Sequence, residues 1–255
     1  PNGPYVIYSS HTIDDNTGNN NQEVDFGEFI SMGVDVQNVG SSDANLVNIN
    51  ISTTDPYITL INATDIINLI PSQQIVSTNN PFTFQVSNQI PDQHIVVFNL
   101  QMTDNLGNSW NSTHNITVNA PSLDHISFYI DDSSLGNGNG KLDAGETVDL
   151  LVDVTNIGHA DFDPLSIITA NMSCITNYVN FNTSNDNIAG LGINGQQSTS
   201  FNVSIDANTP VGTPVEFSFD VGNGSYSHSA IFNEVIGIIN EDYETGDFTQ
   251  YTWDN

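Results

Sequence analysis

The sequence predicts an all-β chain made of two tandem β-sandwich domains with a C-terminal extension. Three observations lead to this prediction: short runs of apolar residues alternate with polar ones, clusters of Gly, Asn, Asp and Ser separate these runs, and one long segment occurs twice. Alternation with a period of two is typical of a strand that buries one face. No window of about 11 residues or more shows good helical periodicity.

The repeated segment predicts where the domains lie. Residues 13–28 recur, with one residue more, as residues 130–146, and Val34–Gly40 then matches Val152–Gly158. A period of about 118 residues is too long for a solenoid repeat and is the size of one sandwich domain. About seven short strands per copy, separated by turns, predict two immunoglobulin-like β-sandwiches. We place them at 1–120 and 121–238, with a C-terminal extension or the start of a further module at 239–255.

The charge of the chain excludes several classes of partner. Asp and Glu number 30 against one basic residue, Lys141, which gives a formal charge of −29. Such a chain cannot neutralise phosphates, so we expect no binding to nucleic acid. The longest apolar runs are far shorter than the roughly 18 residues that cross a bilayer, so we expect no membrane insertion. The carboxylates must be solvated, hydrogen-bonded or neutralised by cations.

The repeated segment contains the best candidate site, an acidic loop that resembles a calcium-binding EF-hand loop. In the second copy, Glu146 takes the last ligand position and Gly140 the sharp turn, but the first position is Leu135. Asp131 or Asp132 would therefore have to reach in from the preceding strand. The predicted calcium ligands of the second copy are Asp131, Asp132, Asn137, Asn139, Lys141 through its carbonyl, Asp143 and Glu146.

The first copy offers a similar set but departs from the pattern at Gln22, where the turn glycine is missing. Its predicted ligands are Asp14, Asp15, Asn19, Asn21, Glu23 through its carbonyl, Asp25 and Glu28. Calcium takes six to eight hard oxygen ligands on a flexible loop, and both segments supply them. The alternative for both copies is a plain hairpin loop rich in turn-forming residues.

The remaining reactive residues predict no catalysis. Cys174 is the only cysteine, and we expect it to be a small buried residue because the chain cannot readily provide the electropositive setting of a nucleophilic thiolate. None of the six histidines has a partner at metal-ligand spacing, so we expect single surface or strand positions. We therefore expect that this chain is not an enzyme.

The acidic loop and the strand end that follows it resemble modules of a known family. Asp131–Glu146 followed by Val152–Gly158 is similar to the β-sandwich modules downstream of the catalytic domain in gingipain-like cysteine peptidases and related type IX-secreted surface proteins of Bacteroidota. The tail from Glu241 to Phe248, with Trp253, looks like the start of an adhesin-type jelly roll. The resemblance implies an extracellular or outer-surface location and a parent protein whose cysteine peptidase domain, if it has one, lies upstream.

Three functions remain open from the sequence. The first is a non-catalytic, calcium-stabilised stalk or adhesion module of a large secreted or cell-surface protein, with other protein domains as partners. The second is a filament subunit that binds identical subunits by strand exchange, through unpaired runs at Tyr5–Tyr8 and Val235–Ile239. The third is a carbohydrate-binding module, with glycans stacked on exposed rings among Tyr5, Tyr8, Trp110, Tyr178 and Tyr226.

Overall fold

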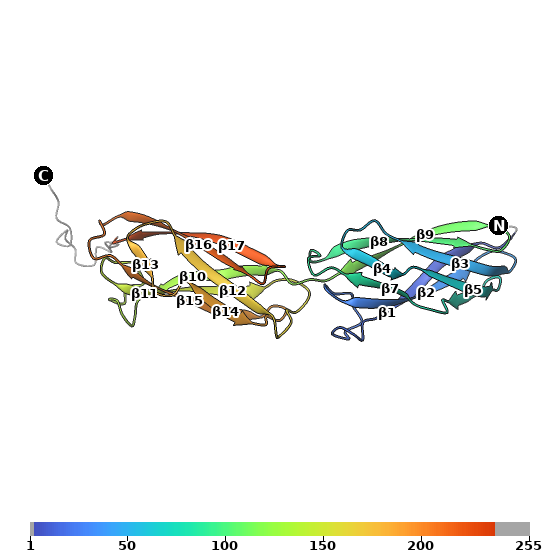
Figure 1. Cartoon of the computed structure of the whole chain (residues 1–255), viewed down its shortest axis with the longest axis horizontal. Helices are drawn as coiled ribbons and strands as arrows, with labels where there is room; N and C mark the ends of the chain where they lie inside the picture. The colour runs from blue at the N-terminus through green and yellow to red at the C-terminus, as the bar shows by residue number, and fades with distance from the viewer. Residues whose placement is uncertain (1–2, 238–255) are drawn as a thin grey trace, which may run out of the picture. The chain divides into compact units, whose positions relative to one another are not determined.

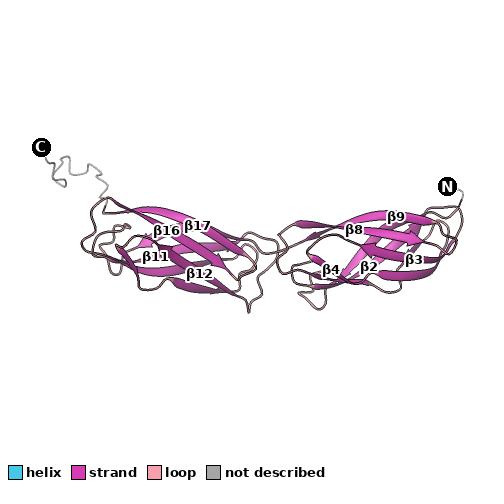
Figure 2. Cartoon of the chain, turned by 45° about the horizontal axis from the view of Figure 1, so that its top comes forward, coloured by secondary structure: helices cyan, strands magenta, loops and turns pink. Residues whose placement is uncertain are grey.

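The computed structural model describes residues 3–237, which form 17 strands and no helix (Figure 2). The predicted all-β class and the tandem immunoglobulin-like sandwiches are therefore confirmed. Within these residues the chain divides into two compact units. Unit 1 runs to Ser122 and also includes Ile157–Phe162, and unit 2 comprises Leu123–Asn156 and the residues from Asp163 onward. Our domain boundary at residue 120 did not foresee that 157–162 belongs to unit 1, and the extension at 239–255 lies outside the described residues.

Unit 1 contains nine strands in two antiparallel sheets (Figure 1). One sheet has the order β1-β2-β7-β4, with β6 also paired to β2, and the other has the order β5-β3-β8-β9. The strands are β1 Val6–Asp14, β2 Phe29–Asn38, β3 Ala44–Ser52, β4 Ile58–Asn62, β5 Thr64–Ile70, β6 Ile75–Ser77, β7 Phe82–Val86, β8 His94–Thr103 and β9 Ser109–Val118.

Unit 2 repeats this plan with eight strands. Its sheets have the orders β10-β11-β15-β13 and β14-β12-β16-β17. The strands are β10 Leu123–Asp131, β11 Thr147–Asn156, β12 Ile167–Cys174, β13 Val179–Phe181, β14 Asn185–Ala189, β15 Gln196–Ile205, β16 Thr213–Gly222 and β17 Ser227–Ile236.

Both units contain more strands than the seven expected, because the chain changes sheets within one continuous run. In unit 1, β4 and β5 are separated by Ala63 alone, yet β4 pairs with β7 and β5 pairs with β3 in the opposite sheet. In unit 2, β13 likewise pairs with β15, and β14 pairs with β12 in the opposite sheet. A sequence run with uniform composition does not reveal such a switch.

The core of each unit follows directly from the alternation. In β2 every second residue is buried, and the matching positions of β11 are buried as well. Fully buried phenylalanines fill the space between the sheets. The ring centroids of Phe84 and Phe98 lie 5.2 Å apart in unit 1, and those of Phe201 and Phe219 lie 6.0 Å apart in unit 2. Each such ring contributes about 1.5–3 kcal/mol of hydrophobic stabilisation.

The Asn-x-Gly motif that ends β2 has a structural explanation. The side chain of Asn38 is fully buried, and its Oδ1 accepts hydrogen bonds from the N–H groups of Tyr5 (3.0 Å) and Gly40 (3.0 Å). Its amide donates to the carbonyls of Ser42 (2.8 Å) and Ile70 (3.0 Å). A Cβ on Gly40 would lie 2.2 Å from a backbone oxygen, so only glycine fits there. The motif therefore fastens the strand end to three backbone segments.

The two terminal runs that prompted the filament hypothesis are paired within their own units. The run at Tyr5–Tyr8 enters β1, which pairs with β2 along its length, and the run from Val235 belongs to β17, which pairs with β16 up to Ile236. The filament hypothesis required these runs to be left unpaired, and the described residues do not meet that condition, because β1 is the first strand of the repeat and corresponds to β10. Residues 238 and 239 lie outside the described part. No helix long and apolar enough to cross a membrane occurs in residues 3–237.

Candidate metal centre

The two acidic loops occupy equivalent places, one between β1 and β2 and the other between β10 and β11. Each loop is also bonded to the opposite sheet of its unit. Asp25 forms a bridge with Asn119, just beyond β9, and Leu142 forms one with Ile236 at the end of β17. The N–H of Gly237 donates to the carbonyl of Leu142 at 2.8 Å. A ligand held by either loop would therefore strengthen the connection between two sheets.

The buried carboxylate of Asp132 organises the loop of unit 2. It is 3% exposed and accepts hydrogen bonds of 2.9–3.1 Å from the backbone N–H groups of residues 138–140. The side-chain amides of Asn137 and Asn139 both donate to Oδ2 of Asp143, at 2.8 and 2.7 Å. The backbone of the loop thus surrounds the carboxylate of Asp132, and two of its side-chain amides bind the carboxylate of Asp143.

The loop of unit 1 has the same bonding. Asp15, 1% exposed, accepts hydrogen bonds from the backbone N–H groups of Asn21 (2.8 Å) and Gln22 (3.3 Å). The amides of Asn19 and Asn21 both donate to Oδ2 of Asp25, at 2.6 and 2.9 Å. Two segments of different sequence therefore build one arrangement.

A glutamate closes each loop, and unsatisfied carboxylate oxygens lie beside it. Glu28 accepts hydrogen bonds from the N–H groups of Asn19 (3.1 Å) and Asp25 (3.0 Å). Among the described residues, Oδ1 of Asp25 and Oε2 of Glu146 are buried without a hydrogen-bond partner. A buried acceptor without a donor is costly, and a buried charge more so.

The pKa values in the loops respond to this crowding. Burial is the largest cause that raises the pKa of Asp25, of Glu28 and of Glu146. Neighbouring carboxylates raise them further, including Asp15 beside Glu28 and Asp143 beside Glu146. In both loops the protein holds negative charge where it is unfavourable, and a bound cation would relieve this.

The structure brings most of the predicted ligands together. The clustered residues are Asp15, Asn19, Asn21, Asp25 and Glu28 in unit 1 and Asp132, Asn137, Asn139, Asp143 and Glu146 in unit 2. Other predicted ligands make different contacts. Asp14 accepts a hydrogen bond from Asn16, and Asp131 from Ser133. The carboxylate of Glu23 accepts one from the amide of Asn119, and the N–H of Lys141 donates to Oδ1 of Asn139.

Gln22 has the backbone conformation of the turn glycine that it replaces. Its φ is 68°, against 72° for the equivalent Gly140 in unit 2. Two residues earlier in each loop, Asn20 and Gly138 also have similar φ values, 59° and 79°. The left-handed region costs a residue other than glycine about 1–2 kcal/mol. The departure from the EF-hand pattern at Gln22 therefore leaves the shape of the loop unchanged.

Other residues considered for chemistry or sugar binding have different surroundings. Cys174 is partly rather than fully buried, and burial raises the pKa of its thiol, opposite to the shift that activates a nucleophile. Trp110 is 8% exposed and therefore cannot present its ring face to a glycan. A hollow of about 530 Å³ on unit 1 has Asn50, Asn99 and Gln101 in its lining, which includes no aromatic residue.

The prediction that the histidines stand singly was wrong. His11 and His114 lie with ring centroids 4.2 Å apart, and His11 Nδ1 lies 2.8 Å from the hydroxyl of Tyr8. Burial, and then His11, lower the pKa of His114 to about 4. In unit 2, His125 and His228 meet although 103 residues separate them. Spacing along the chain could not reveal either pair, because each joins the first and last strands of a sandwich.

Comparisons with known proteins identify no family for this chain. No protein-family model matches the sequence, and no curated protein matches it. Red sea bream transglutaminase resembles the chain at a TM-score of 0.33 and 13% identity, over 92% of this chain, which spans only 31% of that one. A protein of unknown function from Porphyromonas gingivalis has a TM-score of 0.27 and 9% sequence identity, and the match covers 90% of this chain and 100% of that one. The titin domains Z1Z2, solved in complex with telethonin, have a TM-score of 0.33 and 9% sequence identity, and the match covers 94% of this chain and 98% of that one.

Proposed function

We propose that this chain is a non-catalytic, calcium-stabilised stalk or adhesion module of a large secreted or cell-surface protein, with one calcium site in each acidic loop. The observation that carries the proposal is the pair of matching loops. Each gathers three carboxylates and two asparagines, and in each a buried carboxylate oxygen lacks a hydrogen-bond donor. The chain has a single Lys or Arg with which to balance 30 acidic residues.

Calcium suits these loops better than other cations. It accepts irregular sets of carboxylate, amide and carbonyl oxygens at 2.3–2.6 Å, whereas magnesium demands near-ideal octahedral geometry. In unit 2 the amide NH2 groups of Asn137 and Asn139 face Asp143. A half-turn of each amide would present oxygens to an ion instead, in exchange for the hydrogen bonds that these oxygens accept from the N–H groups of Asn139 and Lys141. Extracellular calcium modules work at affinities of about 10⁻⁴–10⁻³ M, which loops on a pre-formed sandwich can supply.

The position of the loops explains why calcium would serve a mechanical role. Each loop leaves one sheet and bonds to the last strand of the other, as Phe26 does to Asn119 at 2.9 Å in unit 1. Binding to the native state alone stabilises that state by RT ln(1 + L/Kd), where L is the free ligand concentration. A stalk needs rigid units rather than an active centre, and the raised pKa of the Cys174 thiol is consistent with this.

The resemblance of the acidic loop and strand end to gingipain-like peptidase modules supports placing the chain outside the cell. In that setting its partners are other domains of a parent protein, and a cysteine peptidase domain, if the parent has one, lies upstream. The filament alternative no longer has the unpaired runs at Tyr5–Tyr8 and in β17 that prompted it. The glycan alternative loses Trp110 as a stacking platform.

The test is a calcium titration of the purified chain by calorimetry, with thermal unfolding in EDTA, in millimolar calcium and in millimolar magnesium. We expect two calcium ions per chain, a higher melting temperature in calcium and a much smaller effect of magnesium. Sedimentation in calcium should show monomers. Identical melting curves in EDTA and calcium would refute the calcium sites, and regular fibres in calcium would refute the monomeric stalk.

A further inference from the structure

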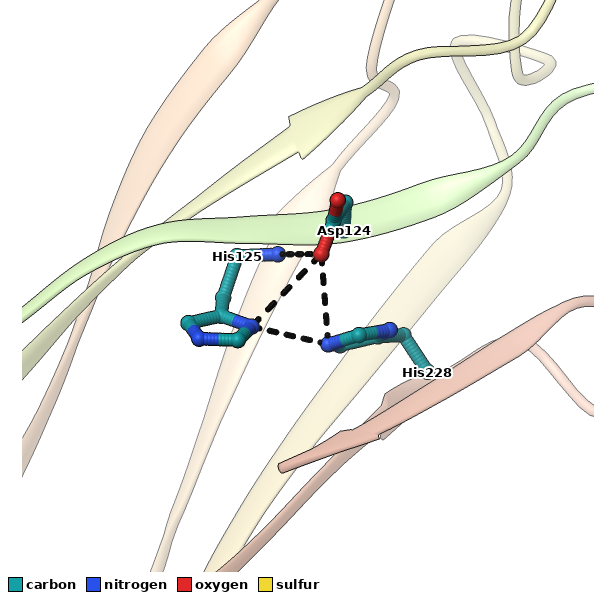
Figure 3. A group of neighbouring side chains, drawn as sticks. All are labelled: Asp124, His125 and His228. Atoms are coloured by element: carbon teal, nitrogen blue, oxygen red, sulfur yellow. Dashed lines mark hydrogen bonds and ion pairs between the residues drawn. The ribbon is translucent and has the colours of Figure 1, made fainter. Parts of the chain in front are cut away.

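Unit 2 has a second cluster of possible metal ligands, with two members at the start of β10, whose other end leads into the acidic loop, and one on β17. Strands β10 and β17 are the edge strands of the two opposite sheets. Asp124 and His125 lie on β10 and His228 lies on β17, and all three side chains point to one place (Figure 3). Within residues 3–237 this is the one group of three His, Cys, Asp or Glu side chains whose ligand atoms all lie within 4.8 Å of one another.

The distances in this cluster suit three ligand atoms of one metal ion. Nδ1 of His125 lies 2.9 Å from Nε2 of His228, and Oδ1 of Asp124 lies 3.6 and 3.4 Å from these two nitrogens. A hydrogen bond between the rings accounts for the first distance, but the other two exceed the usual 2.7–3.2 Å of an N–H···O bond. Ligand atoms at 2.0–2.1 Å from a tetrahedral zinc ion are about 3.3 Å apart. The three atoms therefore form a triangle close to one face of such a tetrahedron.

The backbone holds two of these ligands in place. The N–H of His125 donates to Oδ1 of Asp124 at 2.8 Å, which fixes the carboxylate beside the ring that follows it. The pairing of β10 with β11 is irregular between His125 and Ser127, and such a bulge re-aims side chains on an edge strand. The ring of Phe232 packs edge-on against His125, with centroids 5.4 Å apart. The ligands are thus oriented before any ion binds.

Unit 1 provides an internal comparison, because it has the same bulge without the ligands. Tyr8 pairs with Val36 as His125 pairs with Val154, so Tyr8 stands in the place of His125 and Ile7 in that of Asp124. The fold alone therefore does not require two histidines and an aspartate here. Their presence in unit 2 is a property of its sequence.

We propose that Asp124, His125 and His228 bind a divalent transition-metal ion of the zinc type. Two imidazoles and one carboxylate are ligands that zinc accepts, whereas calcium prefers oxygen ligands alone, so this site is chemically distinct from the acidic loops. The three side chains keep 43%, 33% and 23% of their surface exposed, which leaves the ion open to water and to entry from solvent. The bound ion joins β10 to β17 and so links the edges of the two sheets of unit 2.

The experiment titrates zinc into the full chain by calorimetry while calcium is in large excess, so that the hard-oxygen loops are occupied. We expect one zinc ion per chain and NMR shifts confined to the ring signals of His125 and His228. Replacement of either histidine, as His228→Ala or as His125→Tyr with the residue present in unit 1, should weaken zinc binding by more than about tenfold. Cobalt in place of zinc should give the intense visible absorption of a tetrahedral site.

The matched control is His94→Ala, because His94 in unit 1 also contacts a carboxylate, that of Asp55, at 2.7 Å. This variant should bind zinc as the unchanged chain does. Melting curves without metal identify any variant that fails to fold, and Asp124→Asn then provides a third substitution at the site. Absence of zinc binding in excess calcium would overturn the proposal, as would unchanged affinity in folded His125→Tyr and His228→Ala chains.

Discussion

Replacing the buried Asp25 by asparagine should change the response of unit 1 to calcium while preserving its fold. The side chain is 3% exposed, its Oδ2 accepts two amide hydrogen bonds, and its Oδ1 has no partner. Asparagine has the same shape, and its oxygen can still accept from Asn19 and Asn21. Without metal, Asp25→Asn removes a buried charge, so we expect the variant to be at least as stable as the unchanged chain in EDTA.

In calcium the unchanged chain should be more stable than Asp25→Asn. If the free calcium concentration is about a hundredfold above the dissociation constant, binding stabilises the native state by about 2.7 kcal/mol. For a unit of this size that corresponds to a rise in melting temperature of roughly 10 °C. Asp25→Asn should lose most of this gain for unit 1, and calorimetry should count one calcium ion per chain instead of two.

The effect of pH provides an independent check in EDTA. Because burial raises the pKa of Asp25 above its usual 3.8, the folded state binds this proton more tightly than the unfolded state does. The corresponding stability is fully present below about pH 3.8 and is lost as the pH rises through the higher folded value. Asp25→Asn should lack this loss, so its stability relative to the unchanged chain should grow as the pH rises from 4 towards neutrality.

Asp104→Asn is the control, because Asp104 is also buried in unit 1 but lies in the β8–β9 turn. Hydrogen bonds from Asn108 and nearby backbone groups hold its pKa below the usual value despite its burial. We expect Asp104→Asn to destabilise unit 1 equally in EDTA and in calcium. The reasoning fails if Asp25→Asn and Asp104→Asn respond alike to calcium, or if Asp25→Asn still binds two ions.

Three further predictions concern single residues. Asn38→Ala should cost about 2–4 kcal/mol in chemical denaturation, since it removes four hydrogen bonds, two of them buried and two partly buried. A loss below about 1 kcal/mol would contradict the role given to the motif. Gln22→Gly should stabilise unit 1 by up to about 1 kcal/mol by relieving the left-handed backbone, with no change in calcium stoichiometry. The pKa of His114 measured by NMR should be about 4. Because the pKa of His114 in the folded state is lowered from 6.5, the stability of unit 1 falls as the pH drops from 6.5 towards 4. Phe232 occupies the position of His114 in unit 2, so His114→Phe should reduce that fall.

The sequence predicted the features that depend on local periodicity. Burial in β2 alternates residue by residue, as its apolar pattern indicates, and the repeat located the equivalent strand β11 correctly. Most of the predicted ligands also lie close together in each acidic loop, because they belong to one short segment, while calcium binding itself stays a prediction. Asp132 rather than Asp131 enters the loop of unit 2, since Asp131 is still the last residue of β10 and pairs with Asp149.

What the sequence could not predict depends on contacts between distant strands. The switch of sheets at Ala63 has no signature in composition, because both strands beside it alternate alike. The cluster of Asp124, His125 and His228 exists only because the first and last strands of unit 2 lie at neighbouring edges of opposite sheets. A search by ligand spacing is limited to a few residues and so could not find it.

The two acidic loops, compared with each other, give an argument for a bound ligand that neither gives alone. A loop kept merely as a connection between strands would be expected to relax where its glycines are lost. Unit 1 instead keeps left-handed backbone at Asn20, a residue type that tolerates it, and at Gln22, where it costs about 1–2 kcal/mol; unit 2 has glycines at both positions. The strain preserves the turn that brings Asp15 and Asp25 beside the same amides as in unit 2. Leu46, Gln73 and Gln93 of unit 1 have similar backbone outside the loop, so the strain at Gln22 supports a bound ligand only together with the matching contacts of the two loops. Calcium bound in the loop would offset its cost.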